Sequence, residues 1–319
     1  MQAMGGSFRI LPPGAATTLY LAAPVLALSL LLPWQGQWLC AATVIILLGV
    51  PHGALDVEIG RTLLRHRVGR AWFPLFAAPY LALVAVVLIA WRLAPEPTLA
   101  AFLTVSVWHF GSEETEGSGL PALAIGGLPI TLPTLIHPTA TAQVLSAISS
   151  APLEAPPAWL LWGSLAWSAP ATVWVCRTLV AGPRQALLLP LLLCVGFAAL
   201  PPLVAFTLYF VGVHAPLHTD ALIRHPTRAP RLRGAASAWR RAAPTTLLTI
   251  LIGAALLPLG AGEPAVRLVG VTLQLLAALT LPHLLLDLWL TQREAAWSIA
   301  SKSTPITPLH STEMARSSS

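Results

Sequence analysis

Long apolar runs, separated by short polar segments, make up most of the chain. About 20 apolar residues in a helix cross the hydrocarbon layer of a membrane, and a helix satisfies its own backbone hydrogen bonds there. Ten such runs cover residues 17–33, 37–56, 72–92, 98–112, 121–136, 157–176, 186–200, 202–222, 244–260 and 266–290. The run at 121–136 could re-enter on one side, and the two runs that meet at 201–202 could form one broken helix. We therefore predict an all-α, polytopic membrane bundle of about eight to ten transmembrane helices.

The composition agrees with a surface covered by lipid. Of the 319 residues, 56% are hydrophobic and 9% are charged, whereas about a quarter of the residues in a soluble domain are charged. Too few polar side chains remain to cover a water-facing surface. The net charge of +6 comes from arginines in loops that flank apolar runs, so we expect membrane lipid and not nucleic acid as the partner. The three cysteines are isolated and form neither a disulfide framework nor a zinc motif.

The arginine clusters predict an orientation. They lie at 61–70, 177–184 and 224–241, after the second, sixth and eighth runs, and so share one side of the membrane if each run spans it once. Positively charged loops face the cytoplasm, which places both termini there. We expect one membrane-embedded domain over residues 1–300. The Ser/Thr-rich segment 301–319 is expected to be a disordered cytoplasmic tail.

Five of the nine histidines lie within the apolar runs or at their ends, where an ionisable side chain is costly and so points to function. They are His52, His109, His214, His218 and His283. His214 and His218 are four residues apart, so both imidazoles lie on one helix face and can bind one ion. The orientation puts all five at the cytoplasmic ends of their spans, at one depth. Gathered around one point, they would form a metal site, although a single membrane histidine is more often a hydrogen-bond partner between helices.

Acidic residues follow these histidines at short spacing. Asp56, Glu113 and Asp287 come four residues after His52, His109 and His283, and Asp220 comes two residues after His218. A carboxylate one helical turn away can accept the second ring N–H, which fixes the tautomer and strengthens the imidazole as a ligand. We expect these four carboxylates to orient the imidazoles, with ordinary interfacial charges as the alternative.

The type of ligand limits which metals are candidates for this site. Imidazole suits zinc, copper, iron and nickel, and structural zinc sites usually include cysteine, which does not occur near these histidines. Neutral imidazoles leave coordination positions open, so iron in this site could activate O2, and a substrate inside the membrane would be apolar. The aromatic residues Trp108, Phe110, Tyr209 and Phe210 are candidate walls of a substrate tunnel, and plain helix packing would also account for them.

The motifs around the histidines resemble one known family. PHGALD at 51–56, WHFG at 108–111, the HxxxH of 214–218 after LYFVGV, and LPH at 281–283 occur in the order seen in the Brp/Blh-like family. Its members are bacterial and archaeal membrane β-carotene dioxygenases associated with bacteriorhodopsin-type systems. The resemblance extends from about residue 45 to 290.

This resemblance implies a catalytic domain in the plasma or inner membrane of a bacterial cell, with a centre that holds Fe(2+) toward the cytoplasmic side. It implies cleavage of β-carotene by O2 at the 15,15′ double bond into two retinal molecules, and a functional link to a retinal-binding rhodopsin. By position, His52, His109, His214 and His218 match the proposed iron ligands and catalytic residues of the family. His283 matches a further motif histidine, which we place beside the site without assigning it as a ligand.

The chain departs from the family pattern at two places. Leu217 stands where many members have an arginine, just before the second histidine of HxxxH. Glu113 and Glu114 stand where the motif after HFG often contains aspartate. The exact carotenoid is therefore less fixed by the resemblance than the chemistry.

Other functions fit parts of the pattern. A related metal-dependent oxygenase for another apolar substrate would use the same histidines. A membrane di-iron desaturase or hydroxylase would need denser clusters, and this sequence has no HH pair. A transporter or channel would use the histidines as a relay, and helix breaks near Pro201, Pro202 and Pro216 would suit it. Transporters often contain internal repeats, and we find none in this sequence.

Overall fold

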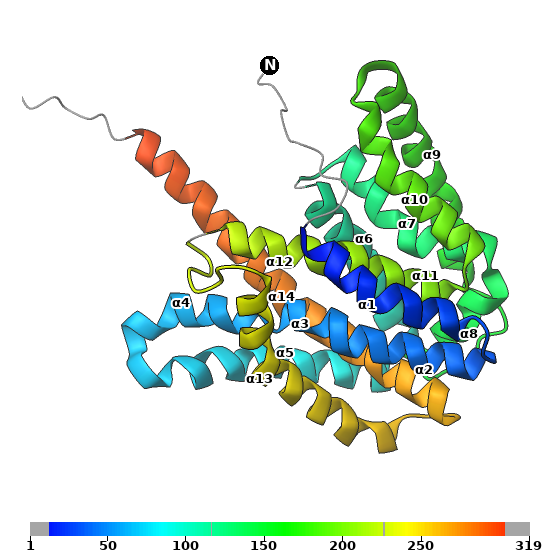
Figure 1. Ribbon diagram of the computed structural model, residues 1–319, viewed down its shortest axis with the longest axis horizontal. Coiled ribbons are helices and arrows are strands. Elements are labelled where there is room, and N and C mark those ends of the chain that lie inside the picture. The colour runs from blue at the N-terminus through cyan, green and yellow to red at the C-terminus, as the bar shows by residue number, and fades with distance from the viewer. Residues whose placement is uncertain (1–12, 116, 226, 304–319) are drawn as a thin grey trace, which may run out of the picture.

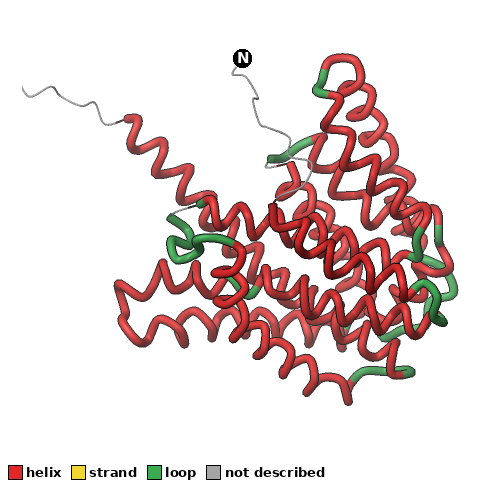
Figure 2. The backbone as a smooth tube through the Cα atoms, in the orientation of Figure 1, coloured by secondary structure: helices red, strands yellow, loops and turns green. Residues whose placement is uncertain are grey.

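The computed structural model describes residues 13–115, 117–225 and 227–303. These residues are helical almost throughout, and the described part of the chain contains no strand (Figure 2). The helices are α1 (Pro13–Ser29), α2 (Trp34–Val44), α3 (Val50–Gly53), α4 (Asp56–Val68), α5 (Trp72–Leu93), α6 (Pro95–Thr115), α7 (Leu120–Ile136), α8 (Pro138–Ser149), α9 (Ala158–Ala181), α10 (Leu188–Ala199), α11 (Pro202–Tyr209), α12 (Ala215–Arg224), α13 (Ala235–Leu256) and α14 (Pro264–Ser303). Two π-helical turns, η1 (Ile45–Gly49) and η4 (Phe210–His214), and three short 3-10 turns, η2 (Gly69–Ala71), η3 (Arg184–Leu187) and η5 (Leu257–Leu259), complete the elements.

The prediction of an all-α membrane fold is confirmed. Each of the ten predicted apolar runs falls on helical structure; the run at 37–56 is formed by α2, η1 and α3, and the run at 202–222 by α11, η4 and α12. Helices α4 and α8 have no run of their own among the ten, because α4 is rich in charged residues and α8 is short. The tail expected from 301 onward lies mostly outside the described residues, and its first three residues, 301–303, end α14.

Several helices are suited to a membrane. By length and composition, three helical stretches of the described chain can cross it, Trp34–Leu93, Ala235–Leu259 and Pro264–Glu294, or four if α7 and α8 form one span bent by 117°. Large apolar side chains also stand on the surface; Leu31 and Val180, for example, are 83% and 88% exposed. Such a surface is expected to contact lipid. The larger count of eight to ten spans stays a prediction.

Helix α14 crosses the whole molecule and connects its two sides (Figure 1). It packs against α2, α5 and α8. On one side, α7 packs between α6 and α9 and also contacts α10; on the other, α4 and α5 run antiparallel to each other (Figure 1). The contact of α6 with α7 is close because glycines lie there: a Cβ at Gly111 would collide with the carbonyl group of Ala122. This packing brings the middle of α14 beside the ends of α3, α6 and η4.

Candidate metal centre

The five histidines predicted to share one depth meet inside the protein. They come from four parts of the chain: His52 from α3, His109 from α6, His214 and His218 from η4 and α12, and His283 from α14. Each is buried, with at most 8% of its surface exposed. The ring centres of His218 and His283 are 4.7 Å apart, and those of His109 and His214 are 4.9 Å apart. The ring of His52 lies 5.4 Å from that of His214 and 5.5 Å from that of His218.

Two irregular helical turns position three of these rings. The π-helical turn η1 ends just before the segment that carries His52, and η4 ends at His214, with His218 one turn further on. The two turns contact each other, and Gly49 lies so close to Phe210 that a Cβ at this glycine would overlap the aromatic ring. A π-helical turn shifts the helix face by one residue and is frequent at functional sites. The local geometry therefore turns these histidines inward at a point where two helices nearly touch.

In three of the five rings, those of His52, His218 and His283, the Nδ1 atom lies within hydrogen-bond distance of an oxygen, and the Nε2 atom takes no part in that contact. The Nδ1 of His52 lies 2.5 Å from the carbonyl oxygen of Gly49, so this nitrogen carries the proton because a carbonyl only accepts. The Nδ1 of His218 lies 2.9 Å from Glu113 Oε1. The Nδ1 of His283 lies 3.0 and 2.9 Å from the two carboxylate oxygens of Asp56. This arrangement is the usual one around a metal-binding histidine, whose outer N–H donates to a carboxylate or carbonyl.

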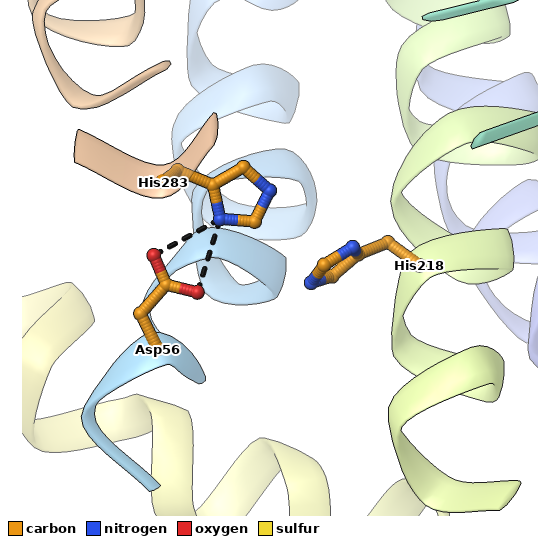
Figure 3. A group of neighbouring side chains, drawn as sticks. All are labelled: Asp56, His218 and His283. Carbon is orange, nitrogen blue, oxygen red and sulfur yellow. Dashed lines mark hydrogen bonds and ion pairs between the residues drawn. The ribbon is translucent and has the colours of Figure 1, made fainter. Parts of the chain in front are cut away.

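Figure 3 shows the last of these contacts together with its neighbour. The carboxylate of Asp56 faces the Nδ1 of His283, and the ring of His218 points toward this pair from a separate helix (Figure 3). The hydroxyl of Tyr80 donates to Asp56 Oδ2 over 3.0 Å. Asp56 therefore bonds His283 of α14. The spacing in the sequence had predicted His52, four residues before Asp56, as its partner. Nothing in the sequence pattern indicates Tyr80, because only the packing of α5 against α14 brings it to the site.

Two neighbouring glutamates of α6 lie among the rings. The Oε1 of Glu113, besides its bond to His218, lies 3.9 Å from His109 Nδ1, and its Oε2 lies 3.8 Å from His214 Nδ1. The side chain of Glu114 is fully buried, accepts a hydrogen bond from the hydroxyl of Tyr209 and lies 3.9 Å from the same His214 nitrogen. The buried carboxylate of Glu113 lies among the rings, and its negative charge would be balanced by a cation held by the histidines. Glu114 was not among the expected site residues; its position next to Glu113 in the sequence was the available signal.

The two remaining predicted carboxylates contact arginines. Asp220 forms an ion pair with Arg224 at 2.9 Å. Asp287, whose side chain is 43% exposed, forms an ion pair with Arg228 at 2.7 Å, and Arg228 also bonds Glu294 at 2.7 Å. The hydrogen bonds to Glu294 raise the pKa of the Arg228 guanidinium above its usual value. Asp287 therefore belongs to a surface ion-pair cluster formed with Arg228 and Glu294.

The donor atoms present in the cluster fit a metal ion. Among the described residues, both ring nitrogens of His214 and the Nε2 atoms of His218 and His283 are buried without a hydrogen-bond partner. Leaving such atoms unpaired is costly, and coordination to a cation would satisfy them. Two sets of three residues each bring their ligand atoms within 4.8 Å of one another. One set is Asp56, His218 and His283, and the other is His109, Glu113 and His214. The cluster can hold a metal, and its donor set does not by itself select iron.

An apolar cavity of about 270 Å³ reaches the histidines. His52, His109, His214 and His283 line it, and most of the other lining side chains are apolar. Of the four aromatic residues expected as tunnel walls, Phe110 and Phe210 line this cavity. Trp108 is instead 42% exposed on the outer side of α6, and Tyr209 is buried against Glu114. Leu217, which replaces the common arginine, packs against the main apolar core.

Comparisons with known proteins give a consistent result. Residues 43–291 match the sequence model of the family described as Beta-carotene 15,15'-dioxygenase. The chain is 26% identical over 264 residues to the Beta-carotene 15,15'-dioxygenase of uncultured marine bacterium 66A03, covering 77% of this chain and 91% of the relative. It is 28% identical over 286 residues to the Probable beta-carotene 15,15'-dioxygenase Blh of Halobacterium salinarum, covering 77% of this chain and 81% of the relative. No solved structure matches the chain.

Proposed function

The chain belongs to the Beta-carotene 15,15'-dioxygenase family, and on this premise we propose that it cleaves β-carotene or a similar carotenoid with O2 into two molecules of retinal. In this reaction the central 15,15′ C=C bond breaks, and one C=O bond forms on each half. Both atoms of O2 are used, so the balance needs no further reductant. Two relatives carry this activity in their names.

The observation that carries the proposal is a buried histidine cluster that opens onto an apolar cavity. We propose that His52, His109, His214 and His218 hold Fe(2+), with His283 beside them. Iron bound there would supply the chemistry that activates O2, while the protein supplies position and environment. The rings of His214 and His218 offer unpaired nitrogens for this purpose. An apolar cavity suits a hydrocarbon substrate better than it suits an ion, which favours an oxygenase over a transporter with a histidine relay.

The chain's own side chains have separate tasks in this proposal. The carbonyl of Gly49 and the carboxylate of Glu113 hold the outer N–H groups of His52 and His218, which would leave the inner nitrogens of these rings unprotonated and able to bind the metal. The carboxylate of Asp56 holds His283 beside them in the same way. The aromatic rings of Phe110 and Phe210 line the cavity beside the histidines and exclude water from the polyene. A carotenoid would therefore be held by shape and apolar contact alone.

We further propose that the protein lies in the plasma or inner membrane of a bacterial cell, with the metal centre toward the cytoplasm. Two arginine-bearing segments, between α4 and α5 and between α12 and α13, lie at the same end of the molecule (Figure 1). Helices α4 and α13, which adjoin these segments, are joined by the ion pair of Arg241 with Glu58, at 3.3 Å. Arginines at one end favour the cytoplasmic side. A retinal-binding rhodopsin would be a natural acceptor of the product.

The test is expression in cells that accumulate β-carotene, with loss of colour and formation of retinal measured by chromatography. The wild type is expected to form retinal, and His52→Ala and His214→Ala are expected to lose this activity. His66→Ala is the matched control, because His66 is exposed on α4. Unchanged β-carotene with the wild type would overturn the proposed activity. Full activity in both ligand variants would overturn the ligand assignment alone.

A further inference from the structure

The two ends of the cavity differ in exposure. Between α5 and α13 it is lined by Phe73, Leu81 and Leu248, which are 43%, 43% and 44% exposed. Its other end lies among α6, α7, α8 and the start of α9, where Leu145 and Leu160 are 7% and 6% exposed. The first end therefore opens toward lipid. The second end is closed by packed side chains.

The closed end is lined by continuous faces of helices. Leu99, Phe102, Leu103 and Ser106 of α6 line it, and so do Thr141, Val144, Leu145 and Ile148 of α8. Both sets have the spacing i, i+3, i+4 and i+7, which places each set on one side of its helix. Helix α8 thus turns one whole face toward the interior of the cavity, and its opposite side carries the exposed Gln143.

The depth of this end follows from helix geometry. Leu99 lies ten residues before His109 on α6, and Leu273 lies ten residues before His283 on α14; all four line the cavity. At about 1.5 Å of rise per residue, both helices carry the lining about 15 Å away from the level of the histidines. A pocket of fixed depth therefore leads from the histidine cluster to α8.

The position of α8 is fixed by contacts at both ends of the helix. At its start, the hydroxyl of Thr141 donates to the carbonyl of Pro133 in α7 over 2.8 Å. At its end, the buried amide of Gln274 in α14 donates to the carbonyl of Ile148 over 2.6 Å. The sharp bend of 117° between α7 and α8 lays α8 across the end of the cavity. Bonds to two different helices make α8 a fixed floor and not a loose cover.

We propose that α8 is the floor of a blind pocket that receives one end ring of the carotenoid and so selects the double bond that lies at the histidines. This inference rests on the proposed function. A conjugated polyene is stiff, so once its ring rests on the floor, the distance to the histidines fixes which bond is cleaved. The other end of the substrate extends toward the opening between α5 and α13. The position of the cleaved bond is thus set by the distance from one end ring, and the second ring does not need to be recognised.

The test is to raise the floor with Leu145→Phe and, as a milder change on the same face, with Val144→Leu. A ring that stops earlier presents a double bond nearer to itself. We expect the retinal yield from β-carotene to fall at least tenfold in Leu145→Phe, with two aldehydes appearing, one shorter and one longer than retinal. Chromatography with mass spectrometry measures their lengths. Gln143→Phe, on the exposed side of the same helix, is the matched control and is expected to give retinal alone.

The outcomes separate this proposal from the proposed function. Absence of retinal from the wild type overturns the proposed function. If the wild type forms retinal, and the two floor variants reach wild-type levels in the membrane with wild-type metal content, retinal alone at the wild-type yield overturns the floor. Loss of every aldehyde in both folded variants also overturns it, because a shifted polyene still has a double bond at the histidines. If Leu145→Phe does not accumulate, Val144→Leu decides by the product lengths.

Discussion

His283 and Asp287 lie one turn apart on α14, and they belong to two different kinds of polar site. His283 is 5% exposed, bonds Asp56 through Nδ1 and leaves its Nε2 without a hydrogen-bond partner among the described residues. The side chain of Asp287 is 43% exposed and bonds Arg228, which also bonds Glu294. In the surface cluster the charges are paired. In the interior, several ring nitrogens of the histidines have no hydrogen-bond partner among the described residues.

The difference in hydrogen bonding between the two sites suggests that one contributes to stability and the other to function. Exposed ion pairs contribute about 0–1 kcal/mol each, so the cluster around Arg228 is a minor part of the fold. Buried polar atoms without partners lower stability and persist where they serve another purpose. The histidine cluster is therefore expected to respond to mutation mainly through metal content and activity. The surface cluster is expected to respond through stability alone.

The largest effect is expected for His214→Ala. His214 is 1% exposed, and both of its ring nitrogens lack a partner among the described residues. Mutation of residues that only hydrogen-bond to a metal ligand already costs about 10–100-fold in metal affinity or activity. Removal of this ring, a proposed ligand itself, should therefore lower retinal formation at least about 100-fold. Retinal per milligram of protein and bound iron are the measurements, with His66→Ala as control. Activity within twofold of the wild type would contradict the assignment.

A smaller effect is expected for Asp56→Asn, which removes the charge that holds His283. We expect metal affinity to fall about 10–100-fold, while Tyr80→Phe, which removes a single hydrogen bond to the same carboxylate, should lower the free energy of unfolding by about 0.5–1.5 kcal/mol. Titration of the metal-free protein with Fe(2+) measures the first effect, and thermal unfolding in detergent measures the second. Equal affinity of Asp56→Asn and the wild type would mean that the pair of Asp56 and His283 does not support the metal.

The smallest effect is expected for Asp287→Asn. Its ion pair with Arg228 is largely at the surface, so the change in unfolding free energy should stay within about 1 kcal/mol and retinal formation should remain within twofold. Thermal unfolding in detergent and the retinal assay are the measurements. A strong loss of activity would show that Asp287 acts on His283 after all, and the contrast between the two sites would disappear.

Much of the fold could be predicted from hydrophobicity, because the ten apolar runs all became helices. Helix α4 and helix α8 could not: α4 carries arginines and begins with Asp56, and α8 is too short and too polar to stand out. This second omission matters, since the closed end of the cavity depends on α8. The break before α11 could be predicted, because α11 begins at Pro202, after an extended Leu200, where two of the apolar runs meet.

The candidate site could be predicted in its histidines but not in their partners. The shared depth of the five rings follows from where they fall in the apolar runs. Asp56, however, is separated from His52 by a break between α3 and α4, and packing brings it to His283, which is 227 positions away in the chain. Neighbouring residues of one helix also diverge, so Phe110 faces the cavity while Trp108 faces outward. Such directions depend on helix packing, which periodicity in one sequence does not fix.

In the proposed function, a metal held by these histidines carries the cleavage of a carotenoid. The most direct test is to strip the purified protein of metal, add Fe(2+) or Zn(2+), and measure retinal formed from β-carotene in air. Zinc has no redox chemistry, so we expect retinal formation to return with Fe(2+) and to stay absent with Zn(2+) and without metal. Equal retinal formation by the metal-free protein, or full recovery with Zn(2+), would contradict the proposed role of iron at these histidines.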